Sequence, residues 1–370
     1  MIIILEPNAQ TKQRELVEAV VELAAQFPGV TTKPYEFSGT GHTFTEIHLI
    51  GSTANVPTTL FEALPGVLRV IRVSTKYRLI GRHQADELQN VGFEYNGVRI
   101  DDSHLHVFAG LCAVDNREHV EMTMAALKKN GIVTTRMGAY KPRTSPYEFQ
   151  GLGKSCLPYV FELAGKYGVR IVTMEVTDAR HIDEINDALE QAGSPTGVML
   201  QIGTRNAQNF ELLRFVGQQK TFPVLFKRGM GISLEESLNA CEYIASEGNP
   251  NIVFCLRGVK SLMGAPHRNL VDFGHVPVVR RQTRLPVCVD PSHSVGSAAV
   301  APDGIMDIFH ATGQGIITGA AMVLVDFHPR KELALCDGPQ ALDLSQLEKF
   351  MLYTSRVRAC YEQLCRDMGA

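Results

Sequence analysis

The pattern of hydrophobic positions divides the chain of 370 residues into two parts that meet near residue 85. In the first part, apolar side chains recur at a helical spacing between residues 11 and 27 and stop before Pro28 and Gly29. Short apolar runs flank this helix, with a glycine-containing turn at residues 39–41 between two of them. The predicted elements are strands at residues 2–5, 30–37, 44–50 and 67–73 and helices at residues 11–27 and 57–64. Their order, βαββαβ, is that of a ferredoxin-like domain.

From residue 86 onward, a strand followed by a helix is the repeating unit. The predicted strands are continuously apolar, as expected of parallel strands that are buried on both faces. They span residues 106–110, 132–138, 170–176, 197–203, 223–229, 252–258, 286–290 and 321–328. Helical patterns include residues 118–129, 206–218, 233–246 and 343–366. Eight strands predict a (β/α)8 TIM barrel. We therefore expect a ferredoxin-like domain at residues 1–85 and a barrel domain at residues 86–370.

Polar side chains stand at or just beyond the end of nearly every predicted barrel strand. In a barrel these ends meet at one mouth, where barrel enzymes carry their active sites. Arginine binds phosphate and carboxylate with a two-pronged fork, and lysine adds a compact charge. The cationic members of the set are Arg136, Lys141, Arg143, Arg205, Lys227 and Arg257. They are too many for one carboxylate, and they predict ligands that together carry two phosphates, or two phosphates and a carboxylate.

A second group at the same strand ends consists of Cys112, His293, Asp326 and Asp337. A thiolate, an imidazole and two carboxylates suit a divalent transition metal such as Mn, Fe, Co or Zn better than Mg. Taken singly, each of these residues is a weak signal, since a cysteine after a strand is more often a small buried side chain and a lone histidine is more often structural.

The composition argues against several classes of partner. A net charge of −3 gives no electrostatic reason to expect nucleic acid or an anionic membrane. No apolar run reaches the roughly 18 residues that span a bilayer, and the first residues have the pattern of a strand instead of a signal peptide. The eight cysteines lack the spacing of a disulfide framework, so we expect reduced thiols and a cytoplasmic location.

Five stretches carry specific motifs: RMGAYKPRTSPYEFQGLG at 136–153, QIGTRNAQNFELL at 201–213, FKRGMG at 226–231, CLRG at 255–258 and VDPSHSVG at 289–296. With weaker matches elsewhere, they resemble the type I-beta 3-deoxy-D-arabino-heptulosonate 7-phosphate (DAHP) synthases over essentially the whole chain. These enzymes are related to the 3-deoxy-D-manno-octulosonate 8-phosphate (KDO8P) synthases. The run Lys141-Pro142-Arg143-Thr144 resembles the DAHP subgroup, because KDO8P synthases typically have an Ala-Asn-Arg-Ser-type sequence there.

The resemblance implies condensation of phosphoenolpyruvate with erythrose 4-phosphate, the first step of the shikimate pathway. Position by position, it implies that phosphoenolpyruvate is held by Arg136, Lys141, Arg205, Lys227 and Arg257. The aldose phosphate would be held by Lys141, Pro142, Arg143, Thr144 and Ser145. The resemblance places the metal on Cys112, His293, Asp326 and Asp337, and we expect Lys141, Cys112 and His293 to be the catalytic residues.

Three positions depart from the family pattern: Leu111 and Met137 replace a usual Pro and Gly, and Asp326 replaces the usual Glu. Aspartate is one methylene shorter, so the metal must shift, a water must intervene, or the site must be weaker. Two alternatives therefore stay open. One is a specialised paralogue that uses another aldose phosphate, as KDO8P synthases do, and the other is a non-catalytic sensor of phosphorylated ligands.

The N-terminal part is similar to a regulatory domain found in some members of this family. The resemblance implies feedback control by an aromatic amino acid at a site between paired subunits, and a homo-oligomer, either a dimer or a tetramer. The alternative is a capping domain that binds no ligand.

Overall fold

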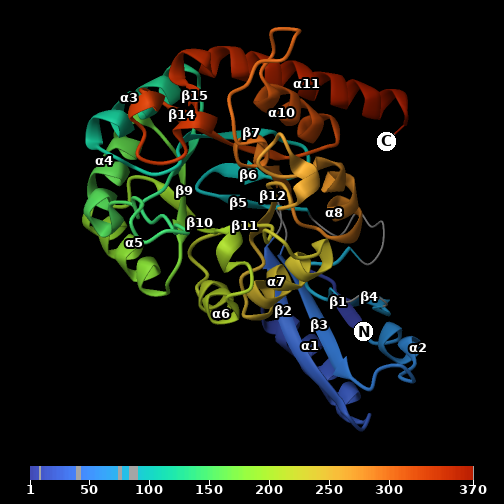
Figure 1. Ribbon diagram of the computed structural model, residues 1–370. Helices are drawn as coiled ribbons and strands as arrows, with labels where there is room; N and C mark the ends of the chain where they lie inside the picture. Colours follow the sequence, from blue (N-terminus) through green and yellow to red (C-terminus); the bar gives the residue numbers. More distant parts are fainter. Residues whose placement is uncertain (8–9, 39–42, 74–76, 83–90, 370) are drawn as a thin grey trace.

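The N-terminal part is an antiparallel sheet with two helices packed on one of its faces. The structure is a computed structural model that describes residues 1–7, 10–38, 43–73, 77–82 and 91–369 (Figure 1). The strands are β1 (Ile2–Leu5), β2 (Val30–Ser38), β3 (Thr43–Gly51) and β4 (Val67–Ile71), in the spatial order β2-β3-β1-β4. Helices α1 (Gln10–Ala25) and α2 (Thr58–Glu62) connect them. This is the ferredoxin-like arrangement that the sequence predicted.

Two apolar layers hold this sheet. Val20 of α1 and Phe61 of α2 pack with Ile3 and Ile47 on one face, and Ile2 and its neighbours are buried on the other. The central strand β1 is therefore apolar at every position, because both of its faces are covered.

The second part is a closed barrel of parallel strands surrounded by helices (Figure 1). Its strands are β7 (His106–Leu111), β8 (Thr134–Met137), β9 (Ile171–Val176), β10 (Gly197–Ile202), β11 (Val224–Lys227), β12 (Ile252–Leu256), β13 (Val287–Val289) and β14 (Met322–His328). Each strand pairs with the next, and β14 pairs with β7 to close the ring. A short strand β15 (Leu342–Asp343) extends the pairing beside β14.

The helices are α3 (Arg117–Lys129), α4 (Leu157–Tyr167), α5 (Arg180–Gln191), α6 (Phe210–Gln218), α7 (Leu234–Ser246), α8 (Val276–Gln282), α9 (Pro291–Val295), α10 (Asp307–Ile317) and α11 (Leu347–Asp367). Ser233 and Glu236 form a capping box that fixes the start of α7. Helix α6 begins four residues later than the pattern predicted, because Asn209 caps it after a short turn at Thr204–Asn206. None of the helices among the described residues is long and apolar enough to cross a membrane.

All eight predicted barrel strands are confirmed, with ends that differ by a few residues. The predicted turn at residues 39–41 and the predicted domain boundary after residue 85 lie outside the described residues. A hairpin that the pattern did not predict, β5 (Phe93–Tyr95) with β6 (Val98–Ile100), precedes β7 and places Phe93, Val98 and Ile100 in the apolar interior of the barrel.

The interior changes from apolar to polar along the strands. Phe108, Leu225 and Leu324 belong to one apolar cluster with the hairpin. Two residues beyond Leu225 and Leu324 stand Lys227 and Asp326, and the residue pairs Met199–Gln201 and Cys255–Arg257 show the same change. Because side chains two apart in a strand share a face, this spacing directs a polar layer into the C-terminal mouth of the barrel.

Polar contacts join the N-terminal sheet to the barrel, and Figure 1 shows β2 beside α7. Lys33 of β2 donates to the carbonyl of Ser246 at 2.9 Å, and Arg284 bonds Glu46 of β3 at 3.2 Å. The connecting backbone at residues 78–80 donates to the carboxylate of Glu242 on α7 over 2.8–3.1 Å.

Candidate active site

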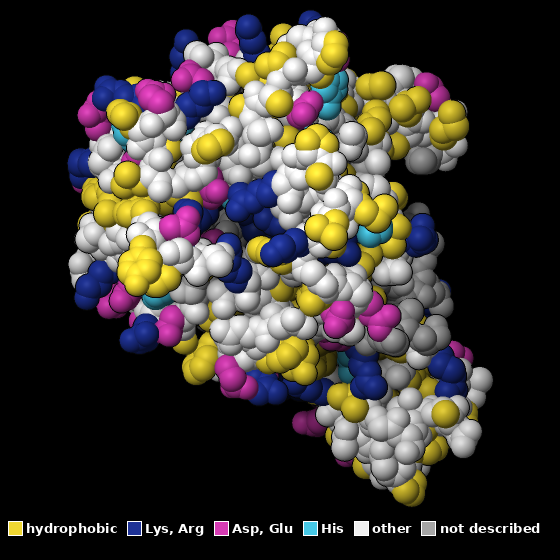
Figure 2. All heavy atoms as spheres, viewed as in Figure 1, with side chains coloured by type: hydrophobic (Ala, Val, Ile, Leu, Met, Phe, Trp, Pro, Cys, Tyr) yellow, Lys and Arg dark blue, Asp and Glu magenta, His cyan; other side chains and the backbone are white. Residues whose placement is uncertain are grey.

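A cavity of about 230 Å3 opens at the C-terminal mouth of the barrel. Figure 2 shows its position as a hollow in the centre of the barrel face with Lys and Arg side chains gathered in it. Six of the lining side chains are cationic and three are acidic. They are Lys141, Arg143, Arg205, Lys227, Arg257 and Arg268, and Glu148, Glu175 and Asp337. This cation surplus makes the cavity a site for anions.

Arg257, just beyond β12, is a buried cation with few compensating contacts. Its side chain is buried, and its one hydrogen bond in the structure is a long one of 3.4 Å to the carbonyl of Gly258. Its Nε has no partner, and no carboxylate among the described residues lies within ion-pair distance. Burial lowers the pKa of this guanidinium, against the opposing effect of Asp290. A buried charge in this state requires an anionic ligand to compensate it.

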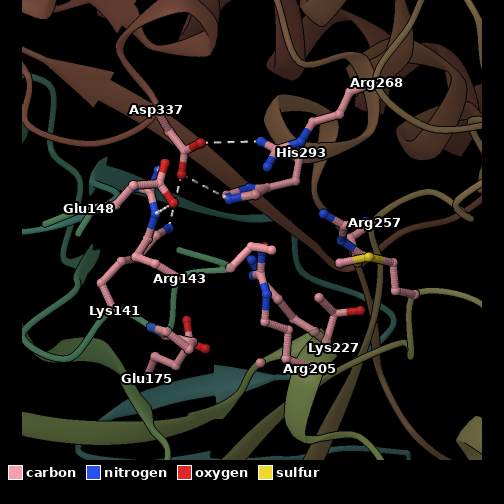
Figure 3. Close-up of a pocket in the computed structure, with 15 residues that line it drawn as sticks. Lys141, Arg143, Glu148, Glu175, Arg205, Lys227, Arg257, Arg268, His293 and Asp337 are labelled. Atoms are coloured by element: carbon pink, nitrogen blue, oxygen red, sulfur yellow. Dashed lines mark hydrogen bonds and ion pairs between the residues drawn. The ribbon is translucent and has the colours of Figure 1, made fainter. Parts of the chain in front are cut away.

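Lys141, His293 and Asp337 converge on the wall of this cavity, as Figure 3 shows, and Cys112 lies buried directly behind them. Lys141 Nζ lies 2.7 Å from Cys112 Sγ and 2.9 Å from Asp337 Oδ2. The thiol of Cys112 lies 3.1 Å from the same carboxylate oxygen and 3.6 Å from His293 Nε2. Residues separated by up to 225 positions in the chain thus meet around one point.

The Cys112 thiol and the Asp337 carboxyl are held in their charged forms. Burial raises the pKa of Cys112, but a hydrogen bond from Cys336 and the charges of Arg136 and Lys141 outweigh it and bring the pKa well below its usual value. The pKa of Asp337 is also far below its usual value, because Lys141 and His293 outweigh the opposing effect of burial. Both groups are therefore ready to act as metal ligands.

Asp290 orients the imidazole of His293. Its carboxylate accepts from His293 Nδ1 at 3.0 Å and from the Lys227 ammonium at 2.6 Å. Burial would raise the pKa of Asp290, but His293 and Lys227 hold it well below its usual value. An Nδ1–H bonded to a carboxylate leaves the Nε2 lone pair free, which is the arrangement usual for metal-bound histidine.

Arg136 and Asp326 form a buried ion pair behind this cluster. Arg136 also donates to the Cys112 carbonyl at 3.2 Å, and the second oxygen of Asp326 accepts from Gln340 at 2.6 Å. Asp326 lies nearest the Nδ1 side of His293, at 3.8 Å. The ion pair therefore packs behind Cys112 and His293 and links β14 to them.

Nine of the residues expected from the sequence line the cavity. These are Lys141, Pro142, Arg143, Thr144, Arg205, Lys227, Arg257, His293 and Asp337. Cys112, Arg136 and Asp326 are buried behind the wall, and Ser145 is not among the lining residues. Arg205 reaches across to the Thr144 hydroxyl at 3.3 Å.

Four other residues at the site were not among the expected substrate or metal ligands. Arg268 bonds Asp337 at 3.1 Å and Gln340 at 2.8 Å, Glu148 pairs with Arg143, and Glu175 bonds Gln201 at 2.9 Å. Cys336 lies 3.1 Å from Asp337 Oδ2. Glu175 stands near the end of a predicted strand and belongs to the polar strand-end residues that the sequence indicated, whereas the other three lie in loops without periodic pattern.

The donors present fit a divalent transition metal. One thiol, one imidazole nitrogen and a carboxylate oxygen lie within 4.8 Å of one another in the group Cys112, His293 and Asp326. Two thiols and a carboxylate oxygen do so in a second group, Cys112, Cys336 and Asp337. Mixed S, N and O donors of this kind suit Zn, Fe, Co or Mn.

The comparison with protein families matches residues 87–362 to the DAHP synthetase I family. The chain belongs to this family. It is 37% identical over 353 residues to a phospho-2-dehydro-3-deoxyheptonate aldolase of Thermotoga maritima, which covers 95% of this chain and 96% of the relative. A 2-dehydro-3-deoxyphosphooctonate aldolase of Bradyrhizobium sp. is 27% identical over 263 residues, with 67% of this chain and 86% of the relative covered.

Solved structures agree with this family assignment. The crystal structure of the Thermotoga maritima DAHP synthase matches with a TM-score of 0.68 and 34% identity, over 100% of this chain and 98% of that one. A truncated form of the Thermotoga maritima enzyme matches with a TM-score of 0.63 and 31% identity, over 79% of this chain and 97% of that one. The family assignment made from the sequence motifs is therefore confirmed.

Proposed function

We propose that this chain condenses phosphoenolpyruvate with erythrose 4-phosphate to give DAHP and inorganic phosphate, the first step of the shikimate pathway. C3 of phosphoenolpyruvate attacks the aldehyde carbon and forms the new C–C bond. Water adds at C2, and the C–O bond to phosphate then breaks. The relative that is 37% identical carries the name of this activity, while the phosphooctonate relatives are 26–28% identical over shorter spans.

One observation carries this proposal: six cations face three carboxylates in one cavity, and the buried Arg257 has no carboxylate partner among the described residues. Two phosphorylated substrates, one of them also a carboxylate, supply the missing negative charge. A single weakly charged ligand would leave the surplus uncompensated.

The residues divide into two binding groups. Lys141, Arg205, Lys227 and Arg257 hold phosphoenolpyruvate, and Arg136 adds its charge from behind the wall. The run Lys141-Pro142-Arg143-Thr144, with Ser145 next to it, holds the aldose phosphate. The contact of Arg205 with Thr144, 3.3 Å long, brings the two groups side by side. Holding two anions in reacting geometry contributes about 7–11 kcal/mol in well-oriented systems.

The metal is Mn, Fe, Co or Zn, held by Cys112, His293 and Asp337, with Asp326 at the remaining family position. When bound, such an ion polarises the aldehyde oxygen as a Lewis acid. Lys141 donates hydrogen bonds to both Cys112 and Asp337 and so holds these two ligands close together. Lys141, Cys112 and His293 are thus the proposed catalytic residues.

The test is phosphate release from phosphoenolpyruvate, measured with erythrose 4-phosphate and with longer aldose phosphates. We expect turnover with erythrose 4-phosphate to exceed the others by at least an order of magnitude in kcat/KM. Preference for a longer aldose would support the specialised-paralogue alternative. Binding of phosphoenolpyruvate without turnover of any aldose would support the sensor alternative.

We also propose that the N-terminal sheet binds an aromatic amino acid effector and that the chain forms a dimer or tetramer. The contacts of Lys33 and Glu46 with the barrel give an effector a physical route to the catalytic part. Calorimetry with Tyr, Phe and Trp on the full chain tests this, and no binding would favour a capping role.

All eight cysteines are free, which supports a cytoplasmic location.

A further inference from the structure

Cys336 and Asp337 are adjacent in sequence, yet their side chains point to the same place. Asp337 has a left-handed backbone, with φ 54° and ψ 25°, and this turn brings Cys336 Sγ to 3.1 Å from Asp337 Oδ2. Non-glycine residues rarely adopt this conformation, and those that do cluster at functional sites. The Cys336 side chain is largely buried, at 8% exposure, against Cys112 and Phe149.

The spacing of donor atoms suits a tetrahedral ion. Bonds of about 2.0–2.3 Å place the ligand atoms of such an ion about 3.3–3.8 Å apart. Cys112 Sγ lies 3.6 Å from His293 Nε2, and His293 Nε2 lies 3.9 Å from Asp337 Oδ2. The sulfur of Cys336, the sulfur of Cys112 and a carboxylate oxygen of Asp337 all lie within 4.8 Å of one another. Cys112 and Asp337 therefore lie close to both His293 and Cys336, and these two residues link the four donors.

Asp326 is less well placed than these four residues to bind a metal at His293 Nε2. Its closest approach to His293 is to Nδ1, at 3.8 Å, and Nδ1 already donates to Asp290. Cys112 Sγ and Asp337 Oδ2 face the opposite nitrogen, Nε2. Both Asp326 oxygens are engaged, one by Arg136 and the other by Gln340. A carboxylate shorter by one methylene than the family's usual glutamate fits this supporting place.

We propose that Cys336 is a metal ligand, so that the site is formed by two thiolates, His293 Nε2 and Asp337, with Asp326 as an outer carboxylate that positions Arg136. This rests on the proposed metal dependence and changes the ligand set within it. In the metal-bound site both sulfurs would be thiolates, and each has a cation beside it: Arg143 donates to Cys336 Sγ at 2.8 Å, and Lys141 donates to Cys112 Sγ at 2.7 Å. Two soft donors select Zn or Fe over Mn more strongly than one does.

X-ray absorption spectroscopy of the full chain loaded with Zn counts the sulfur ligands directly. We expect two sulfurs at about 2.3 Å in the wild type and one in Cys336→Ser. A single sulfur in the wild type overturns the proposal. Because this count is made on the wild type, it does not depend on how well the variant folds.

Cobalt spectroscopy gives a second measurement. In Co-loaded protein, the sulfur-to-cobalt charge-transfer band per bound Co should fall by about half in Cys336→Ser and in Cys112→Ser. It should stay unchanged in Cys156→Ser, a buried cysteine outside the site, and in Asp326→Asn. An unchanged band in Cys336→Ser overturns the assignment.

Turnover measured on the same wild-type preparation separates this inference from the proposed function. A two-sulfur site without turnover of phosphoenolpyruvate and erythrose 4-phosphate would refute the function and leave the ligand assignment standing. A one-sulfur site with full turnover would refute the ligand assignment alone.

Discussion

Lys141 donates a hydrogen bond of 2.7 Å to the sulfur of Cys112, 29 positions earlier in the chain. The same ammonium bonds Asp337 at 2.9 Å, so one lysine joins two of the proposed metal ligands and also lines the substrate cavity. This double contact makes Lys141 the link between the thiol–imidazole–carboxylate cluster and the anion site.

Replacement of Lys141 by Met should therefore abolish most of the turnover while the chain stays folded. Methionine keeps the apolar stem and removes the donor and its charge. We expect kcat to fall by about 10²–10⁴-fold, the range typical of a lost proton donor or acceptor. Steady-state kinetics with measured metal content checks this, with Lys166→Met, an exposed surface lysine, as the matched control. A kcat close to that of the control would remove Lys141 from the catalytic residues.

Replacement of Cys112 by Ala should cost the protein its metal and its turnover together. The thiol is the donor shared by both candidate ligand groups, so its loss weakens either arrangement. The affinity for the metal should fall at least 10–100-fold, because even the loss of an outer-sphere partner of a metal ligand has an effect of about that size. Metal content after dialysis and turnover before and after chelation are the measurements, with Cys156→Ala as control. A fully active, chelator-treated Cys112→Ala enzyme is the contradictory outcome.

The barrel and most of the anion site could be predicted from the sequence, for a physical reason. Parallel strands buried on both faces leave continuous apolar runs, and a charged residue two positions after an inward apolar one, as in Leu225 and Lys227, stands out against that run. The βαββαβ order was readable because α1 has one apolar face and stops before a Pro-Gly pair.

Other parts of the site left no such signal. Arg268 and Cys336 lie in loops, where no period relates a residue to its neighbours in space, and only the fold brings them to Asp337. The sequence identified His293 as a metal-ligand candidate, but which ring nitrogen faces Cys112 is decided by Asp290, which takes the other. The hairpin around Phe93 is too short for a periodic pattern to reveal.

Arg257 offers a test of the anion site that separates binding from stability. Its buried guanidinium has no carboxylate at ion-pair distance among the described residues, so its charge is only partly compensated, by the more distant Asp290, until a ligand binds. Arg257→Met should raise KM for phosphoenolpyruvate by about 10-fold or more, since a charge-assisted hydrogen bond contributes about 1.5–3 kcal/mol. The Tm of the ligand-free protein should stay unchanged or rise.

The matched control is Arg228→Met, at a neighbouring arginine that does have a buried partner, Asp272, at 2.8 Å. This variant leaves Asp272 unpaired, so its Tm should fall. If Arg257→Met lost as much stability as Arg228→Met and kept its KM, Arg257 would be a structural residue and not a ligand for the substrate.

Glu46 joins the N-terminal sheet to the barrel through its ion pair with Arg284. Because this pair needs the ionised carboxylate, its contribution to stability depends on pH. Burial alone would raise the pKa of Glu46, but Arg284 and His48 outweigh it and lower the pKa from 4.5 to about 2. A carboxyl whose folded pKa lies below its unfolded value stabilises the fold fully above about pH 4.5. That contribution declines as the pH falls from 4.5 towards 2.

Glu46→Gln should therefore reduce the free energy of unfolding at pH 7 by about 3 kcal/mol, the low end for a broken buried ion pair. At pH 3 the difference from the wild type should be smaller, because protons already compete for the wild-type carboxylate. Urea unfolding at both pH values measures this, with Glu36→Gln, an exposed residue of the same sheet, as the control that changes little at either. A difference that stays constant or grows between pH 7 and pH 3 would show that the charge of Glu46 does not hold the sheet to the barrel.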